Sequence, residues 1–236
     1  LEDSNIQSDF VQVDEDTRIN VKLKSGQETE INAPGPKVTH AQFEQLLSQI
    51  RRTTNNDIVI VAGSVPNSIP SDAYAQIAQI TEKTGAQLVV DAEKDLVETV
   101  LPYRPLFIKP NKDELEVMFN TTVKSDEDVI KYGKEILKKG AQSVIISLGG
   151  DGAIYVDQHQ SIKAVNPQGH VVNTVGSGDS TVAGMVAGLS MGLNVDEAFQ
   201  QAVASGTATA FSEDLATRDA IENIKSQVTI SVLDGE

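Results

Sequence analysis

Cysteine and tryptophan are absent from this chain of 236 residues, and only 4% of its residues are aromatic. Without cysteine, the chain has no disulfide bond, no thiolate nucleophile and no cysteine-type zinc site, so packing must hold the fold. No apolar run approaches the roughly 18 residues that a membrane-spanning helix needs. Basic residues are scarce, because 19 lysines and arginines stand against 34 acidic residues, a net charge of −15. Such a surface repels phosphate backbones and anionic lipids, so neither nucleic acid nor a membrane is an expected partner.

The length predicts one large α/β domain over residues 1–236, enough to bury a substantial core. The chain begins with Leu1, Glu2, Asp3 and Ser4, which do not resemble a signal peptide. An initial leucine in place of methionine predicts that the chain is incomplete at its N-terminus. Together with the absence of cysteine, this start favours the cytoplasm as the compartment.

From about residue 38, helical periodicity alternates with short β-branched runs, which predicts parallel strands joined by crossover helices. Four continuously apolar runs are expected to be central strands covered on both faces: residues 58–62, 88–91, 106–108 and 144–147. Apolar stripes at helical spacing predict the core-facing sides of helices: Phe43, Leu46, Leu47 and Ile50; Tyr74, Ile77 and Ile80; Val129, Ile136 and Leu137. Two helices rich in alanine and glycine are expected at 177–189 and 195–211.

Two segments depart from this alternation. Residues 10–13, 18–23 and 28–31 alternate polar and apolar side chains around Ser25-Gly26, which predicts an antiparallel ribbon. Such a ribbon could form a flap over a ligand or pair with another subunit. Residues 149–165 predict a second hairpin.

The segment Asn173–Ser180, NTVGSGDS, leads directly into a predicted helix. Backbone N–H groups at Gly176, Ser177, Gly178 and Asp179, together with the positive end of the helix dipole, would form a pocket for an anion such as a transferring phosphoryl group. An acid in a first helical turn is often only a capping residue. Beside an anion pocket, the same carboxylate could instead accept the proton of an attacking hydroxyl. The residues alone leave both roles of Asp179 open.

This loop is neither a Walker loop nor a dinucleotide fingerprint, because the required lysine and third glycine are absent. From Asn173 to Val186 it resembles the C-terminal signature of the PfkB family of sugar kinases. The resemblance implies a ribokinase-like three-layer α/β/α sandwich, with a mostly parallel central sheet and a small β-ribbon lid over about residues 10–36. It also implies that Asp179 is the catalytic base and that Gly176, Ser177 and Gly178 form an anion hole.

Three further segments match the family in type and order. Lys109–Glu114, KPNKDE, resembles the element whose Asn and Glu support nucleotide-bound magnesium, largely through water. A helix cap at Asn111 with a capping box from Glu114 is the alternative, and it is compatible with the first role. Residues 147–153 resemble a glycine turn near the nucleotide, and residues 62–66 a loop at the sugar site. Each could instead be an ordinary turn.

Together these matches imply a nucleotide site made of Lys109, Asn111, Ser147, Gly149, Gly152, Val175, Ala204, Gly206 and Ala208. The implied cofactors are ATP and Mg²⁺. Asn111 and Glu114 are implied to bind the metal, largely through water. A monovalent cation bound through carbonyl groups near residues 212–214 is an open alternative to a simply solvated acidic loop.

The ribbon residues 17–23 and 29–32, with Gly35-Pro36, are most similar to family members that act on ketohexose phosphates. The implied reaction is phosphorylation of D-fructose 1-phosphate at its 6-hydroxyl by ATP, with tagatose 6-phosphate as the alternative acceptor. Arg18 and Ser64 would then bind the sugar phosphate, and Asp179 its hydroxyl. Arg18 could otherwise be an edge-strand charge that resists aggregation. A homodimer through the β lid is also expected.

One departure from the family pattern is large. The family begins with a strand that carries a sugar-binding aspartate and with a G-G-x-G-x-N segment, and neither occurs in this sequence. About the first quarter of a typical member is therefore expected to be missing. A nucleotide-binding or dimer-forming fragment without turnover is the resulting alternative to an active kinase.

Overall fold

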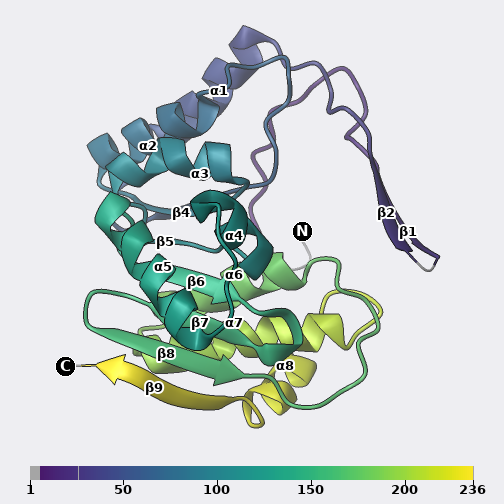
Figure 1. Ribbon diagram of the computed structural model, residues 1–236. Coiled ribbons are helices and arrows are strands. Elements are labelled where there is room, and N and C mark those ends of the chain that lie inside the picture. Colours follow the sequence, from purple (N-terminus) through teal and green to yellow (C-terminus); the bar gives the residue numbers. More distant parts are fainter. Residues whose placement is uncertain (1–5, 26, 236) are drawn as a thin grey trace. The chain divides into compact units, whose positions relative to one another are not determined.

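The computed structural model describes residues 6–25 and 27–235 (Figure 1). Packing divides the chain into two compact units: an N-terminal unit of residues 1–57 and 64–86, and a sheet unit of residues 58–63 and 87–236. The predicted features at residues 1–4 and at Gly26 lie outside the described residues. The prediction of a single domain stays a prediction.

The N-terminal unit contains two strands and two helices: β1 (Asn20–Ser25), β2 (Gln27–Asn32), α1 (His40–Ile50) and α2 (Ala73–Thr84). The strands pair antiparallel from Asn20 opposite Asn32 to Ser25 opposite Gln27, so the predicted ribbon is present. A capping box between Thr39 and Gln42 begins α1. Thr53 and Thr84 share a hydroxyl hydrogen bond of 3.1 Å beside the ends of the two helices.

The expected first strand of the ribbon, residues 10–13, is not a strand. The carbonyl oxygens of Asp9 and Gln12 accept hydrogen bonds of 2.7 and 2.8 Å from the side chains of Gln49 and Gln42, which lie on α1. Because side chains of a helix satisfy these carbonyl groups, the segment runs along α1 without a strand partner. In residues 10–13, the alternation of polar and apolar residues therefore reflects a segment with one side exposed to solvent, and not a strand of a sheet.

The sheet unit is built on seven strands in the spatial order β3-β4-β5-β6-β7-β8-β9. Their bounds are Ile58–Ala62, Gln87–Asp91, Phe107–Ile108, Val144–Ser147, Ala153–Val156, Gln160–Val165 and Thr229–Gly235. The four predicted strands and the second hairpin are thus confirmed within one or two residues. The prediction that all four are central is wrong for β3, which ends the sheet of the described residues and leaves Ile60 46% exposed. Pairs from β3 to β6 are parallel, whereas those from β6 to β9 are antiparallel. The sheet is therefore mixed, with its parallel half first in the chain.

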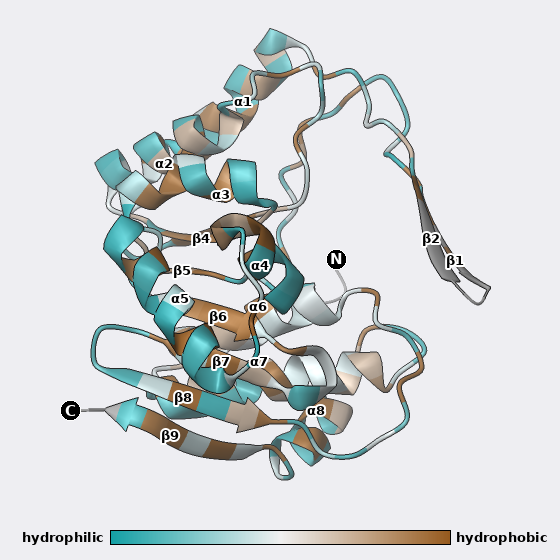
Figure 2. Cartoon of the chain, in the orientation of Figure 1, coloured by the Kyte–Doolittle hydropathy of each residue, from teal (hydrophilic) through white to brown (hydrophobic). Residues whose placement is uncertain are grey.

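Helices and short 3₁₀ turns complete the sheet unit: α3 (Lys94–Val100), η2 (Leu101–Tyr103), α4 (Lys112–Phe119), α5 (Asp126–Lys139), η3 (Gly149–Asp151), α6 (Ser177–Ser190), α7 (Val195–Ala210) and α8 (Arg218–Lys225). In Figure 2, β4, β5 and β6 are coloured mainly hydrophobic, whereas much of α5 is hydrophilic. Among the described residues, no helix is both long and apolar enough to cross a membrane.

Opposite faces of the sheet pack on different helices. Val144 and Val156 face α5, where a Cβ on Gly133 would lie 2.9 Å from a Val156 methyl group. Their neighbours Ile145 and Tyr155 belong to the core cluster with Phe199 of α7. Because successive strand residues point to opposite faces, this alternation gives the sheet a helical layer on each side.

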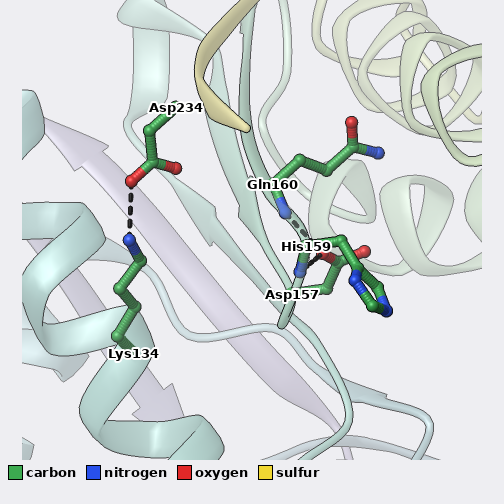
Figure 3. A network of polar contacts seen from close by, with 5 residues as sticks. All are labelled: Lys134, Asp157, His159, Gln160 and Asp234. Atoms are coloured by element: carbon green, nitrogen blue, oxygen red, sulfur yellow. Dashed lines mark hydrogen bonds and ion pairs between the residues drawn. The ribbon is translucent and has the colours of Figure 1, made fainter. Parts of the chain in front are cut away.

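Polar contacts secure the antiparallel half (Figure 3). The Asp157 carboxylate accepts hydrogen bonds from the backbone N–H groups of His159 and Gln160, at 2.7 and 2.8 Å, and closes the turn between β7 and β8. Lys134 of α5 pairs with Asp234 of β9 at 2.6 Å, and the Lys134 ammonium lowers the pKa of the Asp234 carboxyl. Neither β9 nor α8 is among the sequence predictions.

Candidate active site

The carboxyl ends of three adjacent parallel strands bring together residues that are distant in sequence. Asp91 ends β4, Lys109 follows β5, and Ser147 ends β6. Asn111 forms an isolated parallel bridge with Ser147, whose N–H donates to Pro110 O at 3.1 Å. Open α/β sheets bind ligands at this edge, because loops diverge there and leave a crevice.

Lys109 and Asp91 form an ion pair of 3.3 Å whose side chains are only 8% and 20% exposed. Burial raises the pKa of the Asp91 carboxyl, the Lys109 ammonium opposes that rise, and the negative charge of Asp179 adds to it. The ammonium group is therefore held in one place by a carboxylate in a region with little water.

The glycine loop begins α6 as predicted, and Gly176 is its N-cap with φ of +80°. This left-handed conformation strains any residue with a Cβ, and a Cβ here would also lie 2.7 Å from Leu215. Asp179 is exposed in the first turn of the helix. A Cβ on Gly178 would lie 3.3 Å from Lys109 Nζ and 4.0 Å from Asp91 Oδ2. Gly178 thus lets the buried ion pair approach the helix start.

The segment before the helix is tied by its own polar groups. Asn173 Oδ1 accepts a hydrogen bond of 3.1 Å from the N–H of Val175, whose side chain is 50% exposed. The Ser177 N–H donates to Thr174 O at 3.2 Å, so this amide of the predicted anion hole already has a partner. The Ser177 hydroxyl, in contrast, is buried without a partner among the described residues.

Asn111 and Glu114 form the predicted capping box at the start of α4. The Asn111 N–H donates to Glu114 Oε2, and the Glu114 N–H donates to Asn111 Oδ1, both at 2.8 Å. The second carboxylate oxygen of Glu114 is not used by the box. No group of three or more acidic or histidine side chains able to hold a metal occurs among the described residues. The unused carboxylate oxygen of Glu114 fits a magnesium ion that keeps most of its water ligands.

The glycine turn after β6 lies between two hairpin strands. Gly149 and Gly152 have φ of +61° and +92°, and the Leu148 N–H donates to Gly152 O at 2.8 Å. The carbonyl of Gly149 accepts a hydrogen bond of 3.0 Å from the side chain of Asn166. Asn166 in turn accepts one of 2.9 Å from the Thr207 hydroxyl on α7. The turn is thereby connected to the helix that carries the predicted adenine residues.

Those three residues of α7 are buried. Ala204 and Ala208 are 0% and 1% exposed and belong to the hydrophobic core. Gly206 packs on α6, because a Cβ there would lie 2.2 Å from the Thr181 hydroxyl oxygen and 2.9 Å from Ser177 O. The observed contacts of Gly206 support the helix start, and its place near adenine stays a prediction.

Two of the predicted substrate-binding residues, Arg18 and Ser64, belong to the N-terminal unit. An Arg18 guanidinium nitrogen donates to Ser64 Oγ at 2.8 Å, although 46 positions separate the two residues. Both side chains are exposed. The structure thus brings together Arg18, which the resemblance assigns to the substrate phosphate, and Ser64, which it assigns to the sugar site.

Asp91 is a residue of the candidate site that sequence reasoning missed. It entered the predictions only as the end of a strand. A carboxylate at the carboxyl end of a buried parallel strand is unusual, because such strands are otherwise apolar. That position could have marked Asp91 as a site residue, but its partner Lys109 is visible only in the folded chain.

Residues 1–220 match the pfkB family of carbohydrate kinases. This chain belongs to that family, and its activity class is phosphoryl transfer to an alcohol group.

Curated relatives and solved structures refine the placement. The chain is 41% identical to the 1-phosphofructokinase of Bacillus subtilis, over 99% of this chain and 77% of that protein. It is 35% identical to the D-tagatose-1-phosphate kinase of Bacillus licheniformis, over 99% of this chain and 77% of that protein. A crystal structure of a Staphylococcus aureus protein with the provisional name phosphofructokinase is 80% identical and covers 100% of this chain and 77% of its own, with a TM-score of 0.91. Phosphofructokinase-2 from Escherichia coli in complex with potassium is 28% identical over 96% of this chain and 75% of its own, with a TM-score of 0.87. The predicted ribokinase-like fold is confirmed.

Proposed function

We propose that this chain transfers the γ-phosphoryl group of ATP to the 6-hydroxyl of D-fructose 1-phosphate, giving fructose 1,6-bisphosphate and ADP. The observation that carries the proposal is the approach of the buried Lys109 ammonium to Gly178: a Cβ built on this glycine would lie 3.3 Å from Lys109 Nζ. Gly178 lies in the same helical turn as exposed Asp179. A cation, backbone amides at a helix start and a carboxylate base close together are what phosphoryl transfer requires. Similarity to a 1-phosphofructokinase supports the acceptor.

In the proposed step, the 6-hydroxyl oxygen forms a bond to the γ-phosphorus, and the bond to the oxygen bridging the β- and γ-phosphorus atoms breaks. The hydroxyl proton passes to the carboxylate of Asp179, and ADP leaves. The amides at the start of α6 and the Lys109 ammonium stabilise the negative charge on the transferring group. The protein therefore contributes position and charge, with little covalent chemistry of its own.

Nucleotide binding is proposed at Asn111, Ser147, Gly149 and Gly152, on the edge of the sheet beside Lys109. Asn111 and Glu114 would hold Mg²⁺ through water, and the metal would supply charge neutralisation for the phosphates. The carboxylate oxygen that the capping box leaves unused supports this role of Glu114. A monovalent cation near residues 212–214 is proposed on the similarity to a potassium-bound phosphofructokinase-2.

Binding of the sugar phosphate is proposed at Arg18 and Ser64. A guanidinium can hold phosphate through two parallel hydrogen bonds, and the serine hydroxyl adds a donor. Their direct hydrogen bond of 2.8 Å supports a shared ligand, because both side chains would contact the same anion once it displaced that bond.

A homodimer through the ribbon of β1 and β2 is proposed as the assembly, and the cytoplasm, where ATP and sugar phosphates occur, as the compartment. Three apolar side chains of the ribbon, Val21, Leu23 and Ile31, are 42%, 49% and 55% exposed. A two-stranded ribbon with an uncovered apolar face gains stability by pairing with a second copy.

Steady-state ADP release tests the function. The acceptors are fructose 1-phosphate, tagatose 1-phosphate and tagatose 6-phosphate, each assayed with Mg²⁺-ATP. We expect the highest kcat/KM with fructose 1-phosphate. The similarity to a D-tagatose-1-phosphate kinase makes tagatose 1-phosphate the second candidate acceptor.

Each other outcome has a definite meaning. Faster turnover of tagatose 6-phosphate would contradict the proposed acceptor, because its phosphate lies at the opposite end of the sugar. Absence of ADP release with every acceptor, from a folded chain that binds ATP, would support the fragment without turnover. The intact mass of the purified chain tests whether further residues precede Leu1.

A further inference from the structure

The C-terminal turn of α7 contacts the first turn of α6 through one buried hydroxyl group. Thr209 is 2% exposed. Its hydroxyl donates a hydrogen bond of 2.9 Å to Ser180 Oγ and accepts one of 3.2 Å from the backbone N–H of Ala216. Ser180 directly follows Asp179. The hydroxyl of Thr209 therefore links the residue after the proposed base to the chain segment beyond α7.

That segment, residues 211–217, is called here the post-α7 loop, and it contacts the glycine loop at two more points. The side-chain amide of Asn173 donates to Glu213 O at 3.3 Å. Leu215 lies against Gly176, since a Cβ on that glycine would be 2.7 Å from a Leu215 methyl group. The post-α7 loop thus touches both the segment before α6 and, through Thr209, the first turn of α6.

The contacts at Asn173, Gly176 and Thr209 restrain different parts of the glycine loop and of α6. The contacts at Asn173 and Gly176 lie before the helix and restrain the loop that leads into it. Thr209 is the contact that reaches Ser180, inside the helix and next to Asp179. A threonine hydroxyl carries one proton, so the single donor is committed to Ser180 while a lone pair receives the Ala216 amide. Both bonds depend on the same oxygen atom.

We propose that Thr209 is a positioning residue for phosphoryl transfer. Its hydroxyl couples the post-α7 loop to the first turn of α6 and sets the orientation of Asp179 and of the Gly178 amide. The inference rests on the proposed roles of these two groups. A small displacement of a reacting group slows a reaction strongly while ground-state binding changes little.

Replacing Thr209 with valine tests the proposal, because valine keeps the shape and removes the hydroxyl. We expect kcat to fall about tenfold, while KM for ATP and for fructose 1-phosphate each change less than about twofold. Thr209→Ser, which restores the oxygen, should recover kcat to within about a factor of three. A residue with only a structural role would lower the thermal midpoint without this split between kcat and KM.

Thr81→Val is the matched control. Thr81 is also 2% exposed and β-branched, but its hydroxyl bonds to Ala78 O within its own helix, α2. Its removal should lower stability and leave kcat unchanged at temperatures well below unfolding. An equal fall of kcat in the Thr81 and Thr209 variants would overturn the proposal.

A double-mutant cycle with Ser180→Ala tests the route of the coupling and serves as a second variant should Thr209→Val not fold. If Thr209 acts through Ser180, the double variant should be no slower than the slower single variant. The proposal would be overturned if the loss of kcat in the double variant equalled the product of the two single losses. It would also be overturned if kcat of Thr209→Val or of Ser180→Ala stayed within twofold of the unmodified chain. Asp179→Asn in the same assay separates the two claims. Its retained turnover would contradict the proposed base, whereas lost turnover with unaffected Thr209 and Ser180 variants would contradict the coupling alone.

Discussion

The proposed catalytic residues of the sheet unit and the proposed sugar residues of the N-terminal unit are held in different ways. Lys109 is buried, paired with Asp91 at 3.3 Å, and follows a central strand. Arg18 is exposed, and its guanidinium donates a hydrogen bond of 2.8 Å to exposed Ser64. The groups proposed to face the phosphoryl group are thus held by a buried ion pair, while those assigned to the sugar are restrained weakly.

This difference has a consequence for specificity. Charges that stabilise a transition state are effective when they are already oriented, because reorientation would cost free energy during the reaction. Contacts to a substrate can be exchanged without disturbing a core when they lie on the surface. Relatives named for fructose 1-phosphate and for tagatose 1-phosphate kinases both match over 99% of this chain, as expected if acceptor choice depends on few exposed residues.

The largest effect is expected from Asp179→Asn, which removes the proposed base and keeps its shape. We predict a fall in kcat of about 10²- to 10⁴-fold with ATP binding retained. Asp219→Asn is the control, since Asp219 is another exposed acid in the first turn of a helix, α8. A change of kcat below about threefold in the Asp179 variant is under 1 kcal/mol of barrier and would reduce this residue to a helix-end charge.

Arg18→Lys tests the proposed sugar-binding residues, which are exposed and weakly restrained. Lysine keeps the charge and loses the two-pronged geometry, so KM for fructose 1-phosphate should rise at least about tenfold, some 1.4 kcal/mol, while KM for ATP barely moves. Arg52→Lys, at an exposed arginine paired with Asp9, is the matched control and should change neither constant. An unchanged sugar KM in the Arg18 variant would leave Arg18 as an exposed charge ahead of β1.

Glu114→Gln separates a metal role from a capping role. Glutamine can still accept the hydrogen bond from the Asn111 N–H, so the capping box survives while the charge is lost. We predict that the Mg²⁺ concentration for half-maximal activity rises by about three- to tenfold, with little change in sugar KM. Glu197→Gln alters the same type of box, formed with Asn194 at the start of α7, and should leave the titration unchanged. Identical titrations for both variants would leave Glu114 as a cap alone.

The smallest effect is expected in the antiparallel half of the sheet. Burial raises the pKa of Tyr155 above its usual range, and its hydroxyl donates to Asp157 Oδ2 at 3.0 Å. Near neutral pH, Tyr155→Phe should cost about 1 kcal/mol of unfolding free energy. Above about pH 10 the unfolded tyrosine loses its proton before the folded one, so the folded state binds more protons and stability falls as pH rises.

Phenylalanine cannot lose that proton, so the stability difference between the two proteins should narrow above about pH 10. Denaturant unfolding at several pH values measures it. A difference that is constant through pH 11 would show that Tyr155 ionises equally in both states. Unchanged kcat near neutral pH is also expected, because Tyr155 belongs to the core and not to the site.

Local signals in the sequence predicted much of this protein. Apolar runs located four strands, glycines located the start of α6, and the spacing of Asn111 and Glu114 predicted a capping box that both of its hydrogen bonds confirm. These features form between residues a few positions apart, so their free energy depends little on the rest of the chain.

Other features required the folded chain. The segment 10–13 has the alternation of a strand, but side chains of α1 satisfy its neighbouring carbonyl groups. Strand β9 is an edge strand with an exposed face, and its pattern alone is weak. In both cases the partner lies far away in sequence.

The sequence by itself determined the family, the positions of most strands along the chain and the glycine turn that begins α6, since each depends on neighbouring residues. Only the tertiary structure decided that Lys109 pairs with Asp91 beside Gly178, and that Thr209 joins Ser180 to Ala216. These contacts connect different strands, helices and loops. Their geometry depends on strand order and helix packing, which arise from the summed burial of many residues across the whole chain.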